Sequence, residues 1–194
     1  GEAGLAPTTT PSATLAPVPA AAPTKLGRFV AVRRPAPRPG FSPRGLFSGA
    51  VTIVRGTSGV AEPLASLLLS RGVEAVVVDA FDPKAAARVI DLSGLADERS
   101  IEEAIETQKK VFAAGRAVAQ SGETPRFFIA VGDPFFGSPN AEWTGGIPGL
   151  VRTLALEAPE ITSRFIAIAK GRVEADRLAQ SVAAEILEGG ADLD

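Results

Sequence analysis

A glycine-containing loop is the part of this sequence whose residue types and spacing best match a chemical site. Gly56 and Gly59 stand between an apolar run and a helical pattern, where βαβ units carry their dinucleotide-binding fingerprint. Glycines are needed there because the backbone must approach a pyrophosphate at the N-terminus of a helix. Asp79 follows the next apolar run about 20 residues further on, where an acidic side chain binds the ribose. The spacing could therefore support nucleotide binding.

Two departures from the fingerprint favour a structural interpretation of this loop. Ala61 replaces the third glycine, and the spacing is one residue short of the form found in short-chain reductases. We interpret Gly56–Gly59 as a tight turn inherited from a nucleotide-binding ancestor, with retained nucleotide binding as the alternative. Thr144–Gly149 also copies the glycine pattern but follows no predicted strand, and we interpret it as a flexible lead into a helix that starts at Pro148.

The sequence contains no recognisable catalytic group. His, Cys and Tyr are absent, and no Ser or Lys stands in a catalytic arrangement. Acid–base and nucleophilic catalysis need such a side chain with a suitable pKa, and ketone reduction by a short-chain reductase needs a Tyr beside a Lys four residues along a helix. We therefore expect no catalytic, cofactor-binding or metal-binding residue in this chain, and no enzymatic activity of the chain alone.

Three further clusters have ordinary structural explanations. A basic cluster could contact a phosphate or an acyl carrier protein, but solvated linker charge is the favoured interpretation. A charged cluster with helical spacing indicates an exposed helix face with i,i+3 and i,i+4 pairs. An aromatic cluster could line a pocket, although core or interface is favoured. In order, these clusters are Arg33, Arg34, Arg38 and Arg44; Glu102, Glu103, Glu106, Lys109 and Lys110; and Phe135, Phe136 and Trp143.

The elements that must position these residues alternate between strand and helix. Such alternation predicts βαβ units and an α/β fold, a truncated Rossmann-like and mostly parallel sheet with helices on both faces. We expect the long helix to start at Asp97 or Ser100 and to place Ile101, Ile105, Val111, Phe112 and Val118 on one face. We expect strands at 28–33, 50–54, 73–79 (buried), 89–92, 127–131 and 165–169, and helices at 61–70, 97/100–120, 148–157 and 174–187, the last ended by Gly189-Gly190.

The amino-acid composition limits which classes of function are expected. The formal net charge of −2 gives no reason to expect a nucleic-acid partner, and no apolar run is long enough to span a membrane. The lack of Cys excludes disulfides and thiolate metal sites and fits a cytoplasmic location. Residues 1–27 are rich in Ala, Pro and Thr and are predicted to be a linker, followed by one domain at 28–194. Without Met, the chain is expected to be a fragment of a longer polypeptide.

Two stretches carry a resemblance to a known family. Ala87–Leu95 reads ARVIDLSGL before the long helix, and Trp143–Pro159 reads WTGGIPGLVRTLALEAP. They resemble the N-terminal, structural subdomain of the ketoreductase region of type I polyketide synthases and the related polyunsaturated fatty acid synthases. The resemblance covers roughly residues 28–194, and its most specific part is the segment Gly149–Pro159.

The resemblance implies a scaffold role. In that family a second half carries the NADPH loop and the catalytic Ser, Tyr and Lys, while the first half is a truncated copy that braces it. Gly149 and Thr153 correspond approximately to the positions of Tyr and Lys. The implied partner is a downstream catalytic half of the same polypeptide, with an acyl carrier protein as a further candidate. Within this family, the segment Phe135-Phe136-Gly137 favours the iterative, fatty-acid-synthase-like branch over modular synthases.

Two alternatives stay open at this point. The first is a freestanding or regulatory Rossmann-like domain that uses the Gly56–Gly59 loop to bind a nucleotide. The second is an interaction module that docks a carrier domain through the segment 33–44.

Overall fold

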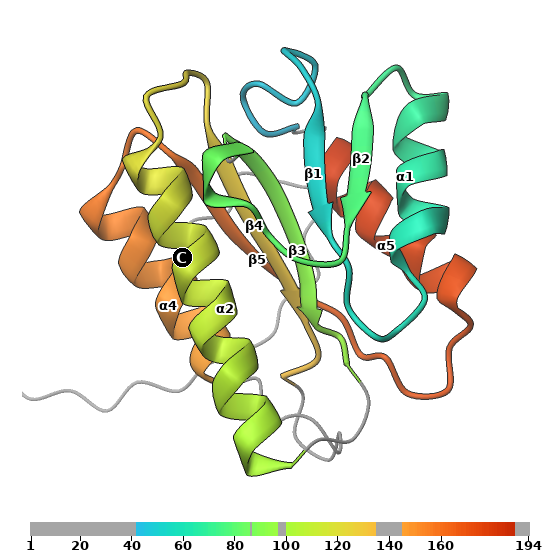
Figure 1. Cartoon of the computed structure of the whole chain (residues 1–194). Coiled ribbons are helices and arrows are strands. Elements are labelled where there is room, and N and C mark those ends of the chain that lie inside the picture. Colours follow the sequence, from blue (N-terminus) through green and yellow to red (C-terminus); the bar gives the residue numbers. More distant parts are fainter. Residues whose placement is uncertain (1–41, 86, 97–99, 135–144, 189–194) are drawn as a thin grey trace, which may run out of the picture. The chain divides into compact units, whose positions relative to one another are not determined.

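The computed structural model describes residues 42–85, 87–96, 100–134 and 145–188 (Figure 1). The chain divides into two units, residues 1–35 and 36–194, and the described residues all belong to the second. The linker at 1–27, the strand at 28–33 and the boundary between them lie outside the described residues. The strands are β1 (Val51–Val54), β2 (Ala75–Val78), β3 (Arg88–Gly94), β4 (Phe127–Gly132) and β5 (Thr162–Ala167), and the helices are α1 (Ala61–Ser70), η1 (Pro83–Ala85), α2 (Ile101–Gln120), α4 (Gly146–Glu157) and α5 (Ala175–Glu188).

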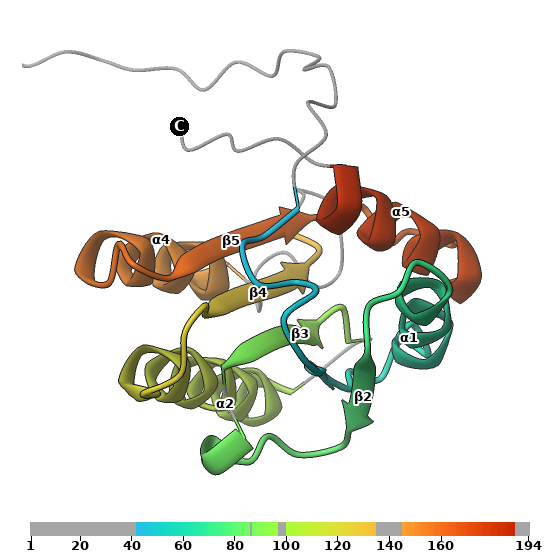
Figure 2. The same ribbon diagram turned by 90° about the horizontal axis from the view of Figure 1, so that it is seen from above.

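The described strands form one five-stranded sheet in the order β2-β1-β3-β4-β5, and every pairing in it is parallel. Helices α1 and α5 cover one face, and α2 and α4 cover the other (Figure 2). The predicted α/β class is therefore confirmed. The chain leaves β1 for β2 on one side and then crosses to β3 on the other, so the strand order reverses between β1 and β3.

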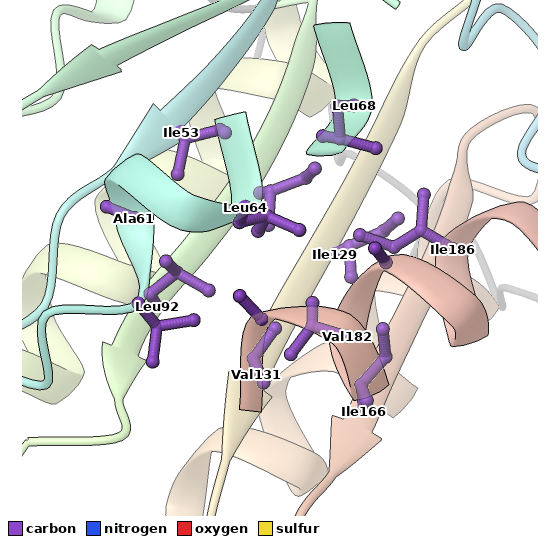
Figure 3. Packing of buried hydrophobic residues seen from close by; sticks show 14 of the residues in the cluster. Ile53, Ala61, Leu64, Leu68, Leu92, Ile129, Val131, Ile166, Val182 and Ile186 are labelled. Carbon is purple, nitrogen blue, oxygen red and sulfur yellow. The ribbon is translucent and has the colours of Figure 1, made fainter. Parts of the chain in front are cut away.

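Two apolar cores lie on the two faces of the sheet because successive strand side chains point to opposite faces. The first joins the sheet to α1 and α5 through residues such as Ile53, Leu64 and Val182 (Figure 3). The second joins it to α2 and α4 through residues such as Phe128 and Val151. Both cores are built of buried aliphatic and aromatic side chains, which fixes the strand ends in place.

Strand β2 differs from the prediction of a buried strand at 73–79. It is shorter, Ala75–Val78, and none of its residues is fully buried. It pairs only with β1, and the connection to β3 contains the short η1 in place of a full crossover helix. A run of valines indicates a buried strand by composition, but an edge position leaves half of it uncovered.

Strand β5 was expected at 165–169 and instead spans Thr162–Ala167. Its ladder begins where Thr162 pairs with Phe127, and it continues to Ala167 opposite Gly132. The first three residues are Thr, Ser and Arg, so the apolar pattern does not show where the strand begins. Pairing with β4 decides its register.

Helix α2 begins after Ser100, one of the two caps considered. The Ser100 hydroxyl accepts a hydrogen bond from the amide of Glu103 (3.2 Å), and the Glu103 carboxylate accepts one from the amide of Ser100 (3.0 Å). The expected apolar face is only partly correct, because Val111 and Val118 are buried whereas Ile101, Ile105 and Phe112 are exposed. The buried face consists mostly of small residues, namely Ala104, Val111, Ala114, Gly115 and Val118.

Candidate functional site

A pocket lies at the carboxyl ends of β1 and β3, where the strand order reverses. Ligands of open α/β sheets bind in this crevice. Its volume is about 680 Å³, in the range of small-molecule sites. Its walls come from the end of β1 and the following loop (Val54, Arg55, Gly56, Thr57), the segment after β2 (Asp79, Ala80, Phe81, Pro83), the β3 region (Asp91, Ser93, Ala96) and α2 (Glu103, Glu106, Thr107, Lys110, Ala113).

The glycine loop at this pocket packs against the protein itself. A Cβ at Gly56 would collide with the carbonyl oxygen of Leu92 in β3. Gly59 has a φ of +72°, and a Cβ there would face Ala175 of α5 at 3.7 Å. Ala61, at the position of the third glycine, is the first residue of α1 and is buried in the core. Backbone packing against Leu92 requires a glycine at position 56, and the positive φ favours one at position 59.

Arg55 connects the two acidic groups at the mouth of the loop. Its Nε lies 3.0 Å from Oδ1 of Asp79, and its Nη2 lies 2.7 Å from Oε1 of Glu62. Asp79, the position expected to bind a ribose, is therefore engaged by a guanidinium of the same chain. Glu62 stands in the first turn of α1 and places a carboxylate at the helix end that would otherwise attract a phosphate.

Two buried carboxylates, Asp91 within β3 and Asp133 directly after β4, were not singled out by the sequence analysis. Asp91 and Asp133 are each only 2% exposed. Oδ1 of Asp91 accepts a hydrogen bond from the amide of Ser93 (2.8 Å), and Oδ2 of Asp133 accepts one from the amide of Lys170 (3.0 Å). Asp133 thus joins the end of β4 to the segment after β5. The available signal was an Asp within or directly after an apolar strand.

Helix α4 places Gly149 and Thr153 on its exposed side. No heavy atom lies within 4 Å of a Cβ built on Gly149. Helix α4 begins at Gly146, so the predicted start at Pro148 was two residues late, and Gly146 and Ile147 belong to the first turn of the helix. Thr144 lies outside the described residues.

The other clusters of the sequence analysis are only partly described. Arg44 is exposed, whereas Arg33, Arg34 and Arg38 and the aromatic cluster Phe135, Phe136 and Trp143 lie outside the described residues, as do Gly189 and Gly190. The charged cluster of α2 is exposed throughout. Within it, Nζ of Lys109 lies 2.7 Å from Oε1 of Glu106, and this hydrogen bond and charge lower the pKa of Glu106.

Among the described residues, no group of three or more His, Cys, Asp or Glu side chains could hold a metal ion. No helix in the described ranges is long and apolar enough to cross a membrane.

Comparisons with known proteins bear on the fold. No family model matches the chain, and no curated protein matches it. Among solved structures, the chain is similar to the crystal structure of a small-chain dehydrogenase, with a TM-score of 0.52 and 17% identity over 72% of this chain and 90% of the other. The chain therefore has a Rossmann-like α/β fold like that of this dehydrogenase structure. The strand-end pocket lies where open α/β sheets bind their ligands.

Proposed function

We propose that this chain is the non-catalytic, structural half of a β-ketoacyl reductase region in a polyketide or polyunsaturated fatty acid synthase. In this role it braces a downstream NADPH-dependent catalytic half of the same cytoplasmic multienzyme. The observation that carries the proposal is the engagement of Asp79 by Arg55 at 3.0 Å. Asp79 stands where a cofactor-binding carboxylate would be expected, but it is paired with Arg55 of the same chain. On this proposal the chain keeps the reductase-type fold and does not bind the cofactor.

Two features of the crevice disfavour a dinucleotide phosphate. The space beside Gly56 belongs to the carbonyl of Leu92. The charged lining is mainly acidic, with Asp79, Asp91, Glu103 and Glu106 against Arg55 and Lys110. Like charges repel the phosphates of a dinucleotide, because the potential of a cleft follows the sign of its lining. The packing and charge of the pocket therefore support the proposal that the fold was inherited and cofactor binding was lost.

The catalytic helix position offers no proton donor. Gly149 has no side chain and Thr153 carries an alcohol, whose proton is not transferred near neutral pH without an activating base. The buried carboxylates Asp91 and Asp133 already accept hydrogen bonds from backbone amides. These groups therefore serve to hold the backbone within β3 and after β4, which suits a bracing domain.

The two outer strands support a partner domain beside the sheet. In the described sheet, β2 pairs only with β1, and β5 only with β4. Unpaired strand edges promote association with other chains and are commonly covered. A catalytic half of the same polypeptide would be available to cover one of them.

The test is to express this chain and the downstream half separately and to mix them. NADPH oxidation with a β-ketoacyl thioester surrogate should appear, and thermal stability should rise, only when both are present. Turnover by this chain alone would contradict the proposal. Equal activity and stability of the downstream half without it would also contradict the proposal.

The size of the pocket favours a second candidate, a Rossmann-like module that binds a nucleotide. Calorimetric titration with ATP, NADH and NADPH separates the two functions. Saturable binding accompanied by no effect on a downstream reductase would favour the nucleotide-binding module. A carrier-protein pull-down tests the remaining alternative, docking through residues 33–44.

A further inference from the structure

Helix α2 carries a stripe of large apolar side chains that the fold leaves exposed. Ile101, Ile105 and Phe112 are 57%, 48% and 54% exposed. Their spacing of four and seven residues places all three on one side of the helix. An exposed apolar row of this kind on a soluble domain indicates an interaction surface. We call these three residues the α2 stripe.

The α2 stripe lies on the side of α2 that adjoins α4. Gln108 falls on the same helical face, between Ile105 and Phe112, and its side chain packs against Gly146 of α4. One turn past Phe112, a Cβ built on Gly115 would lie 3.4 Å from Leu154 of α4. The two helices lie side by side over the sheet (Figure 1). Because Gly149 has no side chain, nothing projects from the outer surface of α4 at this position. Together they form a surface that another helix can approach closely.

The charges on α2 are divided along its length. Beside the α2 stripe, Glu102 stands in the first part, and Lys109 and Arg116 stand in the second. Glu103, Glu106 and Lys110 point away from the stripe and line the strand-end pocket. All six side chains are exposed. A second α2 running antiparallel would bring its basic part beside this acidic part, and the reverse at the other end. The helix is therefore complementary to its own copy in charge.

Ile105 and Phe112 follow the same symmetry, whereas Ile101 lies opposite Arg116 of the second copy. If a two-fold axis passes between Gln108 and Lys109, Ile105 lies opposite Phe112 of the second copy. Glu102 then lies close to Arg116 of the second copy, because these positions are nearly equidistant from the axis. Neither Glu102 nor Arg116 has an ion pair with another described residue. An isologous interface needs such a self-complementary patch.

We propose that the α2 stripe binds a second copy of this chain, with the two α2 helices antiparallel and the two-fold axis between Gln108 and Lys109. The surface is one helix wide, about 22 Å from Ile101 to Arg116 at 1.5 Å per residue. It is therefore expected to give a dimer with a micromolar dissociation constant. The reductase role proposed above is not needed for this interaction.

Sedimentation and light scattering of the whole chain from about 5 μM to about 500 μM should show a monomer–dimer equilibrium. Phe112→Ser should abolish the dimer, while Leu69→Ser, on α1 at the other face of the sheet, should leave it unchanged.

A charge exchange tests the proposed ion pair. Glu102→Arg or Arg116→Glu alone should weaken the dimer about fivefold to tenfold. The double variant E102R/R116E should restore it, since the pair is exchanged in both copies. Arg177→Glu on α5 is the matched charge control.

A cross-link tests the register. The chain contains no Cys, so Gln108→Cys provides a single thiol close to the proposed axis, and mild oxidation should yield a covalent dimer. Leu69→Cys should yield far less. Circular dichroism and melts establish that each variant is folded. The proposal is wrong if the folded wild-type chain stays monomeric, if E102R/R116E fails to restore the dimer, or if only the downstream half covers the stripe.

Discussion

The carbonyl oxygen of Leu92 lies where Gly56 would carry a side chain. This contact joins the loop after β1 to the middle of β3. It explains why position 56 is a glycine although Ala61 occupies the position of the third glycine of the fingerprint. The backbone approach is required by the sheet, whether or not a nucleotide is present.

Gly56→Ala should therefore destabilise the fold. A new Cβ against a backbone carbonyl forces a shift of β1 or β3, at a cost of about 1–3 kcal/mol. Urea denaturation measures the loss. The control is Gly149→Ala, which meets open space on a helix and should stabilise by about 0.5–1 kcal/mol. A neutral Gly56→Ala would show that the contact is readily relieved.

NADPH should not bind this chain with useful affinity. The Arg55–Asp79 pair, the packed Gly56 and the acidic pocket lining all oppose it. Calorimetric titration at millimolar NADPH should show no saturable heat. A dissociation constant below about 100 μM, or about −5.5 kcal/mol, would contradict this prediction. A reductase with an intact glycine loop serves as the positive control.

Removing the cap of α2 should weaken the domain. Ser100→Ala loses the hydroxyl that accepts from the Glu103 amide, and such changes cost about 1 kcal/mol. Glu103→Gln should cost less, because Gln can also complete a capping box. Denaturation curves of Ser70→Ala, an exposed Ser whose hydroxyl donates within α1, provide the comparison. Equal effects of Ser100→Ala and Ser70→Ala would argue against the cap.

Glu106 should titrate at a lower pH than an ordinary Glu because Lys109 donates a hydrogen bond to it and holds a positive charge beside it. A pKa lowered in the folded state gives stability that is present above the unfolded pKa. That stability is lost as the pH falls through the folded pKa. The contribution is small because both side chains are exposed.

Carboxyl NMR titration tests this assignment. Lys109→Ala should raise the pKa of Glu106 toward its ordinary value, and Lys109→Arg should keep it low. Added salt should reduce the difference between the two variants, since exposed charges are screened. A pKa of Glu106 that does not respond to Lys109→Ala would contradict the assignment.

The sequence by itself determined the features that depend on local signals. Helix α1 was predicted at residues 61–70 and spans Ala61–Ser70, because Gly59 and Gly72 stop the helix pattern on either side. The alternation of apolar strands with helices determined the α/β class, and Ser100 with Glu103 supplied one of the two candidate starts of α2. The glycine loop identified in the sequence lies at the carboxyl end of the sheet, which is the end that carries the pocket.

Only the tertiary structure decided which partner each of these groups meets. Arg55 and Asp79 are far apart in the sequence but adjacent at the ends of paired strands. The apolar residues of α2 gave no indication that Val111 would be buried and Phe112 exposed. That choice depends on how closely the small residues of α2 let it approach the sheet and α4. Side-chain periodicity defines the possible faces of an element, whereas packing against neighbours selects the one that is buried.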